Sequence, residues 1–395
     1  MTTKTMTTST HLAGLSGADA DALGRELDGI RDQVLAARGD SDARYIRRIV
    51  ALQRGLEACG RGSLLVSLLP PAWLAGTTML ALAKILENME IGHNVLHGQW
   101  DWMRDPEIHS TTWQWDFVTP SEAWKHTHNN VHHTWTNVIG RDRDVGYTIL
   151  RVSDDQSWRP WHLAQPLSTL INAALFEWGI AFFDLELDAV LAGKKSKRKL
   201  VEQVGALLAK ATKQMAKDYL LFPLLSGPSA LPTLAANVTA NLTRNVWAHV
   251  IIFCGHFPEG AETFTEEQIE GETRGEWYVR QLLGSANIDG GAIFHVLSGN
   301  LSHQIEHHIF PDIPSNRYAE IAPRVREICE RYGLSYTIGP LRKQYGNVLR
   351  KINRYALPRR SESAAARASL AASFAALPVR SATPDAAMQP VRLAG

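Results

Sequence analysis

The chain has little of what marks several common classes of protein. Its 395 residues include three isolated cysteines and no Cys-x-x-Cys pair, so a disulfide framework is excluded and a reducing environment is expected. The net charge is only +1, and lysine and arginine are scattered apart from one run at 194–199. No nucleic-acid partner is therefore expected.

Redox-cofactor motifs and strand patterns are also missing. The sequence contains no His-Pro-Gly-Gly haem motif, no cysteine quartet for an iron–sulfur cluster and no Gly-x-Gly-x-x-Gly dinucleotide fingerprint. The chain therefore cannot take hydride from a nicotinamide cofactor by itself. Alternating β-branched runs are scarce and helical periodicity dominates, which predicts an all-α fold.

Three apolar stretches predict helices that enter a membrane. Residues 63–86 carry one charge and are long enough to cross hydrocarbon, although Pro70 and Pro71 must kink or break the helix. The others are 163–183 and 219–254, the second long enough for two passes. Because the mean hydropathy of −0.16 is low for a multi-pass protein, a soluble helical enzyme stays open as the alternative.

Amphipathic segments and basic flanks predict the orientation. Residues 45–59 fit an interfacial helix, and 199–217 fit a surface or membrane-plane helix. Basic residues flank the apolar stretches at 47–48, 194–199 and 359–360, so the positive-inside rule places the polar regions in the cytoplasm. We expect a multi-pass protein of the cell membrane, with about four passes and a cytosolic helical cap.

Composition divides the chain into three parts. Residues 1–40 begin with a Thr/Ser-rich stretch and are predicted to be a flexible segment. Residues 41–345 hold the apolar stretches and the polar motifs, and are predicted to form the membrane domain. Residues 346–395 are predicted to be an extension, largely disordered after about 360, where Ala, Arg, Ser and Pro dominate.

The chain is rich in clustered histidines. Eight of its fifteen histidines lie in three short blocks, and within each block histidines stand four residues apart. Positions i and i+4 share one helical face, and imidazole is a common ligand for iron, zinc and copper. Eight imidazoles exceed the need of one tetrahedral zinc and suit two metals. The blocks contain His93 and His97; His128, His132 and His133; and His303, His307 and His308.

Adjacent histidines in two blocks indicate a dinuclear centre, because helix neighbours point about 100° apart and can face different metals. Two carboxylates stand near the first block. Glu90 is three residues before His93, and Asp101 is four after His97. Each could orient an imidazole by accepting its free ring N–H. A solvated helix end is an equally open interpretation of both.

The blocks, in this order, resemble those of the membrane fatty acid desaturase superfamily. The resemblance covers roughly residues 60–345 and rests on HNNVHHTWTN with the following GRDRDVG at 140–146, and on LSHQIEHHIFPDIPSNRY. The third block is the most specific of the three. The whole chain looks most similar to actinobacterial stearoyl-CoA and front-end-like acyl desaturases.

This resemblance implies a centre of two iron ions held by histidines. The implied ligands are His93, His97, His128, His132, His133, His307, His308 and one histidine between the second and third blocks. For that last position we prefer His256, which ends an apolar run in GHFPEGAE, over His249 with its neighbour Asn245. Gln304 stands where many relatives have histidine, so it either binds through water or leaves the role to His303.

The resemblance also implies the reaction and the partners. Dioxygen and two electrons would convert a long-chain acyl thioester, expected to be stearoyl- or palmitoyl-CoA, to its cis-Δ9 alkene; an acyl-lipid substrate stays open. Electrons would come from a separate NAD(P)H-dependent flavin and iron–sulfur protein, docked near 194–199. Arg141 and Arg143 could pair with CoA phosphates, although a solvated charge cluster is equally open.

Other functions share some of these features. A di-iron membrane hydroxylase of lipids or alkanes would use similar histidine blocks, but its third block differs from QIEHHIFP. A membrane metal carrier would place its ligands within the spans rather than beside them. A soluble zinc hydrolase would need a His-Glu-x-x-His motif, which is absent.

Overall fold

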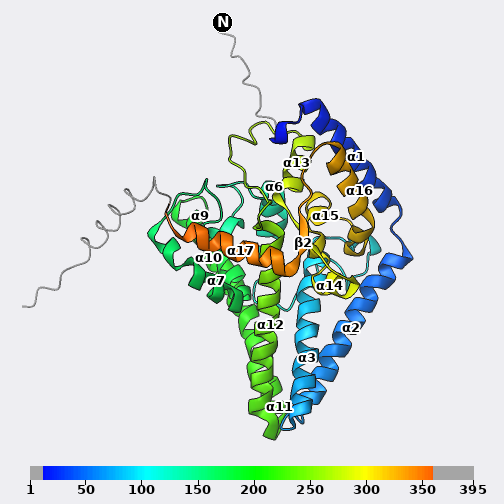
Figure 1. Ribbon diagram of the computed structural model, residues 1–395. Helices are drawn as coiled ribbons and strands as arrows, with labels where there is room; N and C mark the ends of the chain where they lie inside the picture. The colour runs from blue at the N-terminus through cyan, green and yellow to red at the C-terminus, as the bar shows by residue number, and fades with distance from the viewer. Residues whose placement is uncertain (1–11, 359–395) are drawn as a thin grey trace, which may run out of the picture.

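The computed structural model describes residues 12–358. The predicted disordered tail beyond 360 and the first eleven residues lie outside this part of the chain. Within it, the fold is almost wholly helical, as predicted (Figure 1). The longer helices are α1 (Gly17–Ala36), α2 (Asp40–Leu64), α3 (Pro70–Leu86), α7 (Gln165–Ala174), α8 (Phe176–Phe183), α10 (Lys197–Ala216), α12 (Ala230–His256), α13 (Arg274–Gly284), α16 (Tyr318–Arg331) and α17 (Leu341–Ala356).

Shorter elements complete the chain between these helices. Two three-residue strands, β1 (Asn287–Asp289) and β2 (Ile338–Pro340), pair in parallel. The short helices are α4 (Asn94–Leu96), α5 (Ser121–Trp124), α6 (His133–Trp135), α9 (Leu187–Leu191), α11 (Phe222–Leu225), α14 (Ala292–Leu297) and α15 (Gln304–Ile309).

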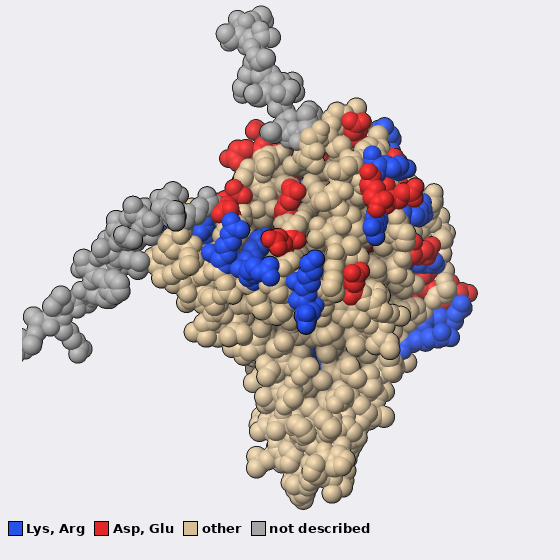
Figure 2. Space-filling view, in the orientation of Figure 1, with Lys and Arg blue, Asp and Glu red and all other residues tan. Residues whose placement is uncertain are grey.

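The molecule consists of a broad cap above a narrow stem (Figure 1). The stem contains the lower parts of α2, α3 and α12, together with α11. Its lower half shows no lysine, arginine, aspartate or glutamate on the face drawn in Figure 2, whereas charges gather on the cap. Large apolar side chains at this end are exposed: Leu65, Val66, Leu68, Leu69, Leu74, Leu224, Leu225 and Leu231.

The first predicted apolar stretch is a helical hairpin rather than one span. Helix α2 ends at Leu64, and α3 begins with Pro70 and Pro71. Proline is tolerated in the first turn of a helix, because the backbone N–H that it lacks would have no partner within the helix there. The two helices pack closely, because a Cβ on Gly76 would lie only 3.0 Å from the carbonyl oxygen of Gly60. The two prolines thus mark the start of the second helix of the hairpin, and the glycines allow the two helices to approach closely.

Within residues 12–358, no single helix combines the length and the apolar character needed to cross a membrane. One bent pair, Pro160–Ala174 with Phe176–Leu191, has both properties by length and composition, with a bend of 101°. The predicted number of about four passes stays a prediction.

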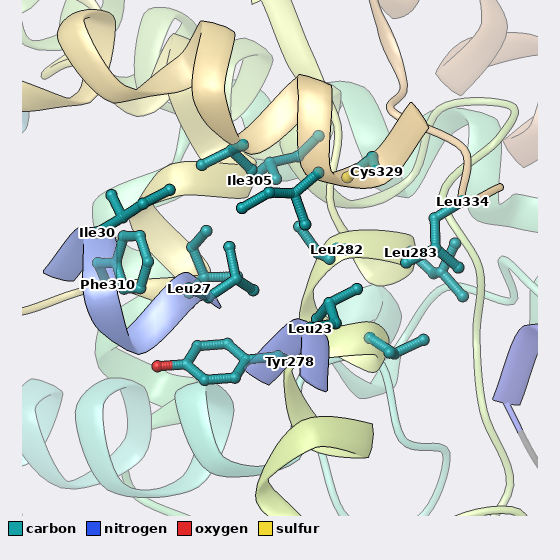
Figure 3. Packing of buried hydrophobic residues seen from close by; sticks show 14 of the residues in the cluster. Leu23, Leu27, Ile30, Tyr278, Leu282, Leu283, Ile305, Phe310, Cys329 and Leu334 are labelled. Atoms are coloured by element: carbon teal, nitrogen blue, oxygen red, sulfur yellow. The ribbon is translucent and has the colours of Figure 1, made fainter. Parts of the chain in front are cut away.

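The upper cap has its own apolar core, drawn in Figure 3. Leu23 and Leu27 of α1 pack with Leu282 of α13 and with Ile305 of α15, and all are nearly inaccessible to solvent. Burying one such side chain contributes about 1.5–3 kcal/mol. The segment 1–40, predicted to be flexible, thus includes a helix that packs against the element carrying the third histidine block.

Helix α17 crosses the predicted boundary at residue 346. Val348 and Ile352 on this helix are buried in the core that also contains Tyr147 and Phe253. The side-chain amide of Gln165 donates a hydrogen bond to the carbonyl oxygen of Ile352. The helix therefore belongs to the cap rather than to a separate extension.

Candidate metal centre

Two of the three histidine blocks lie on π-helical turns. Residues Glu87–His93 and Lys125–His132 are π-helices, each continuous with flanking α-helix. A π turn widens the helix and often marks a functional site. Gly92 permits the first turn, since a Cβ there would lie 2.8 Å from both the Glu87 carbonyl oxygen and the Trp115 Cβ. The regular α-helix expected from the spacing does not occur here.

The structure brings seven of the predicted ligands into two adjacent groups. In the first group, the ligand nitrogens of His93, His97, His128 and His307 all lie within 4.8 Å of one another. In the second, those of His132, His256 and His308 meet the same condition. These residues come from four separate helical segments of the chain, so only the tertiary fold assembles the groups.

His133 lies between the two groups. Its ring stacks on that of His308 with centroids 4.5 Å apart, and lies 4.7 Å from His97 and 4.8 Å from His307. Both of its ring nitrogens are buried and make no hydrogen bond. It is therefore placed to serve either group.

Three histidines have one ring nitrogen fixed by a partner outside the centre. The Nδ1–H of His132 donates to the carboxylate of Asp142 at 3.0 Å. That of His307 donates to the hydroxyl of Tyr318, and that of His308 to the Oε1 of Gln281, each at 3.2 Å. This leaves Nε2 of each ring facing the centre, the arrangement that orients imidazoles for a metal.

The remaining nitrogens show that the site fits a metal. The Nε2 atoms of His97, His128, His132 and His308 are buried without a hydrogen-bond partner. Buried polar atoms are almost always satisfied, so these four atoms lack the partner that a metal ion would provide. Two ions, one for each group, would satisfy them.

Burial keeps most of these imidazoles neutral, which is the ligating form. It lowers the pKa of His93 to about 3 and also lowers the pKa of His97, His128 and His308. His132 differs. Burial lowers its pKa, but the charge of Asp142 and then that of Asp144 outweigh this effect and raise it to about 9.

Two aspartates near the second block were not predicted as site residues. Asp142 accepts from His132 and from the backbone N–H groups of Asn137 and Asp144, at 2.8 and 2.9 Å. An oxygen of Asp144 forms a third group with ligand nitrogens of His128 and His132. The sequence signal was the pair of acidic residues in the stretch GRDRDVG at 140–146, where only the two arginines were given a predicted role.

The two predicted carboxylates at the first block face away from its imidazoles. Glu90 accepts hydrogen bonds from Tyr45, Asn300 and Ser315 at 2.7–2.9 Å. Asp101 accepts from the backbone N–H and the hydroxyl of Ser110. Glu90 therefore joins side chains from three segments of the chain, and Asp101 holds the backbone at Ser110.

Gln304 and His303, the two alternatives left open for a further ligand in the third block, have different surroundings. The side chain of Gln304 lies 3.0 Å from the Nε2 of His256, so it contacts the second group. His303 lies beside His295, with ring centroids 4.6 Å apart, and belongs to neither group.

His249 and Asn245 lie further along α12. The His249 ring stacks on Phe253 at 3.9 Å and belongs to neither group. Asn245 is bonded to Arg244 and to the carbonyl oxygen of Ala174.

Both arginines expected to bind a headgroup have carboxylate partners. Arg141 pairs with Glu266 at 2.9 Å, and Arg143 pairs with Asp188 at 2.7 Å. Their positive charges are therefore largely balanced within the protein.

An apolar pocket adjoins the centre. His93, His128 and His256 form one part of its wall. Most of the remaining lining is apolar, and it includes six aromatic side chains: Trp115, Phe117, Trp124, Tyr147, Phe176 and Phe183. Such a lining suits a hydrocarbon chain held beside the histidine groups.

A helical cap that holds two groups of buried imidazoles beside an aromatic pocket defines a metal-dependent enzyme acting on an apolar substrate. Residues 69–340 match the family described as fatty acid desaturase. The chain is 50% identical to the NADPH-dependent stearoyl-CoA 9-desaturase of Mycobacterium tuberculosis, over 88% of this chain and 82% of that protein.

A more distant relative is the sn-1 linoleoyl-lipid 6-desaturase of Synechocystis, 26% identical over 68% of this chain and 76% of that protein. The chain belongs to the fatty acid desaturase family, and it is an oxidoreductase. The predicted family and enzyme class are confirmed.

Proposed function

We propose that the protein introduces a cis double bond at the Δ9 position of a long-chain acyl-CoA, using dioxygen and two iron ions. The observation that carries this proposal is the pair of buried histidine groups beside one aromatic pocket. The similarity to a stearoyl-CoA 9-desaturase supports the acyl-CoA substrate and the bond position.

The first iron would be held by His93, His97, His128 and His307, and the second by His132, His256 and His308, with His133 between them. When bound, the irons would supply the oxygen activation that an unactivated methylene requires. Imidazole nitrogens in this number suit iron better than a single zinc.

The protein's own residues would position the substrate and exclude water. The aromatic wall of the pocket would hold the acyl chain extended beside His128 and His256. Because most of this lining is apolar, an acyl chain that fills the pocket would keep water away from the histidine groups. Asp142 would keep the His132 ring in one orientation throughout turnover.

We further propose that the stem enters the lipid bilayer and that the cap with the histidine blocks faces the cytoplasm. The exposed leucines of the stem and the absence of charge on its lower half in Figure 2 support insertion. The bent pair α7–α8 carries further exposed apolar side chains, including Leu167, Leu170 and Phe182. This bent pair would lie in the surface of the same membrane that the stem enters.

Electrons would come from a separate NAD(P)H-dependent protein with flavin and an iron–sulfur centre. The absence of haem, iron–sulfur and dinucleotide motifs from the sequence supports this proposal. The basic run 194–199 stays our proposed docking surface for it. Lys197, Arg198 and Lys199 in this run are exposed.

The test is the product formed in a host that lacks its own desaturase. Gas chromatography–mass spectrometry of the lipids should show an alkene two mass units lighter than its precursor. An alcohol heavier by one oxygen would instead show a hydroxylase, and an unchanged lipid profile would remove the proposal.

Iron content provides the second measurement. His308→Ala should lose both iron and product, because it removes a ligand from the second group. His109→Ala is the matched control, since His109 is partly exposed, contacts Thr111 and Asp101, and belongs to neither histidine group. An iron-replete, active His308→Ala protein would contradict the proposed centre.

A further inference from the structure

The aromatic pocket accounts for the acyl chain but not for its polar headgroup. Of the neighbouring cavities, the largest has a volume of about 660 Å³ and shares Trp115 with the pocket. It lies between α2, the loop at 113–120 and α10. A substrate whose chain lies beside the histidines could place its headgroup here, on the other side of the Trp115 indole.

One face of α10 and the residue after it line this cavity with positive charge. Lys210, Lys213 and Lys217 stand at i, i+3 and i+7, a spacing that places all three on one side of a helix. Arg54 of α2 adds a fourth cation. The partly exposed indole of Trp113 offers an aromatic surface beside them.

The cavity also has three carboxylates, and two of them have cationic partners. Glu57 is paired with Arg61 at 2.8 Å, and Asp116 is paired with Lys84 at 2.6 Å and with Lys217 at 2.9 Å. Glu87 accepts a hydrogen bond from the Trp113 indole.

Within residues 12–358, neither Lys210 nor Lys213 forms an ion pair with a carboxylate. The ammonium of Lys210 donates only to the carbonyl oxygen of Thr119, at 2.9 Å. Burial lowers the pKa of Lys210 to about 8, so an anion placed beside it would regain part of the lost solvation. The described contacts of Lys213 include no ion pair.

A second adjoining cavity suits an anion less well. It has a volume of about 410 Å³ and shares Asp184 with the aromatic pocket. Its lining includes Glu122 and Glu202 as well as Asp184, against the single cation Lys199. This negative balance favours the larger cavity for a phosphate.

We propose that Lys210 and Lys213 bind the phosphate groups of the substrate's headgroup in this cavity. The proposal rests on the desaturase function proposed above and adds to it a site for the carrier. Phosphate occurs both in coenzyme A and in phospholipids, so the same two lysines would recognise either carrier. Trp113 would contact the remainder of the headgroup.

The test uses full-length, iron-loaded protein with Lys210→Gln and Lys213→Gln combined. Binding of free coenzyme A is measured by titration calorimetry and does not depend on turnover. Because both lysines are at least partly exposed and water screens their contacts, loss of the two charges should weaken this binding by about tenfold and raise KM for stearoyl-CoA by a similar factor, while kcat changes less than about twofold. Wild-type alkene formation in the same assay tests the proposed function separately.

The control is Lys343→Gln with Arg350→Gln, an exposed cationic pair on α17 outside the cavity. It should bind coenzyme A as the wild type does. If no variant binds coenzyme A, vesicles of phosphatidylglycerol are the second probe. Slower conversion of their acyl chains by the Lys210/Lys213 variant alone would assign the site to a phospholipid phosphate.

Two outcomes would overturn the proposal. The first is a Lys210/Lys213 variant that matches the wild type with both probes. The second is an equal loss in the α17 control, which would show unspecific attraction to positive charge.

Discussion

Replacing Asp142 by Asn would test whether the carboxylate behind His132 prepares the second histidine group. The substitution keeps the shape of the side chain and removes its charge. Asp142 is buried and accepts three N–H donors, from the His132 ring and from the backbone of Asn137 and Asp144. An amide can accept on one atom only, so its NH₂ group must face one of the three donors.

The structure sets the size of the effect. At least one charge-assisted hydrogen bond is lost, at about 1.5–3 kcal/mol, and one buried donor is left unpaired. If the free donor is the His132 ring, the ring is no longer held with Nε2 toward the centre. Loss of such a supporting contact typically lowers metal affinity by about 10–100-fold, which is about 1.4–2.8 kcal/mol.

Iron retention against a graded series of chelator concentrations measures this affinity. We expect Asp142→Asn to release iron at a chelator concentration at least tenfold lower than the wild type. Asp28→Asn is the control, because Asp28 forms a partly exposed ion pair with Arg274, and neither residue belongs to a histidine block or to either histidine group. Wild-type retention by Asp142→Asn would refute the assigned role.

Three other predictions concern the centre, its helix and its electrons. His256→Ala should lose iron as a block mutation does, whereas His249→Ala should lower thermal stability and keep iron. Gly92→Ala should lower iron content, because its Cβ would meet backbone at 2.8 Å, while Gly55→Ala, with open space around it, should not. Protein with acyl-CoA, oxygen and NADPH alone should form no alkene, and a flavin and iron–sulfur reductase should restore turnover at a salt-sensitive rate.

Each of these has an outcome that would count against it. Iron loss from His249→Ala instead of His256→Ala would move the eighth ligand along α12. A fully loaded Gly92→Ala protein would show that the π turn tolerates a methyl group. Alkene formed with NADPH alone would reveal a redox site that the sequence motifs do not show.

Much of the candidate centre followed from local sequence. Histidine type and spacing are properties of a few neighbouring residues, so the three blocks predicted the ligands and the dinuclear arrangement. The two prolines at 70–71 likewise predicted the break between α2 and α3. Helical periodicity, also local, predicted the all-α fold.

The tertiary structure decided which groups meet. Tyr318 lies on α16 and Gln281 on α13, yet they hold His307 and His308. Nothing in the local pattern of either residue marks this role, because it depends on how α13, α15 and α16 pack in the upper core. The division of the histidines into two groups depends on the same packing.

Charge balance was also decided by the fold. Arg141 and Arg143 looked available for a phosphate in the sequence, but Glu266 and Asp188, 125 and 45 residues away, neutralise them. No role was predicted for Lys210 and Lys213, because their helix was expected to lie on a surface. The fold instead places them in a cavity beside the aromatic pocket. The sequence determines which chemical groups the chain carries, whereas ion pairs and cavities form between distant segments, so only the packed structure decides which charges remain free.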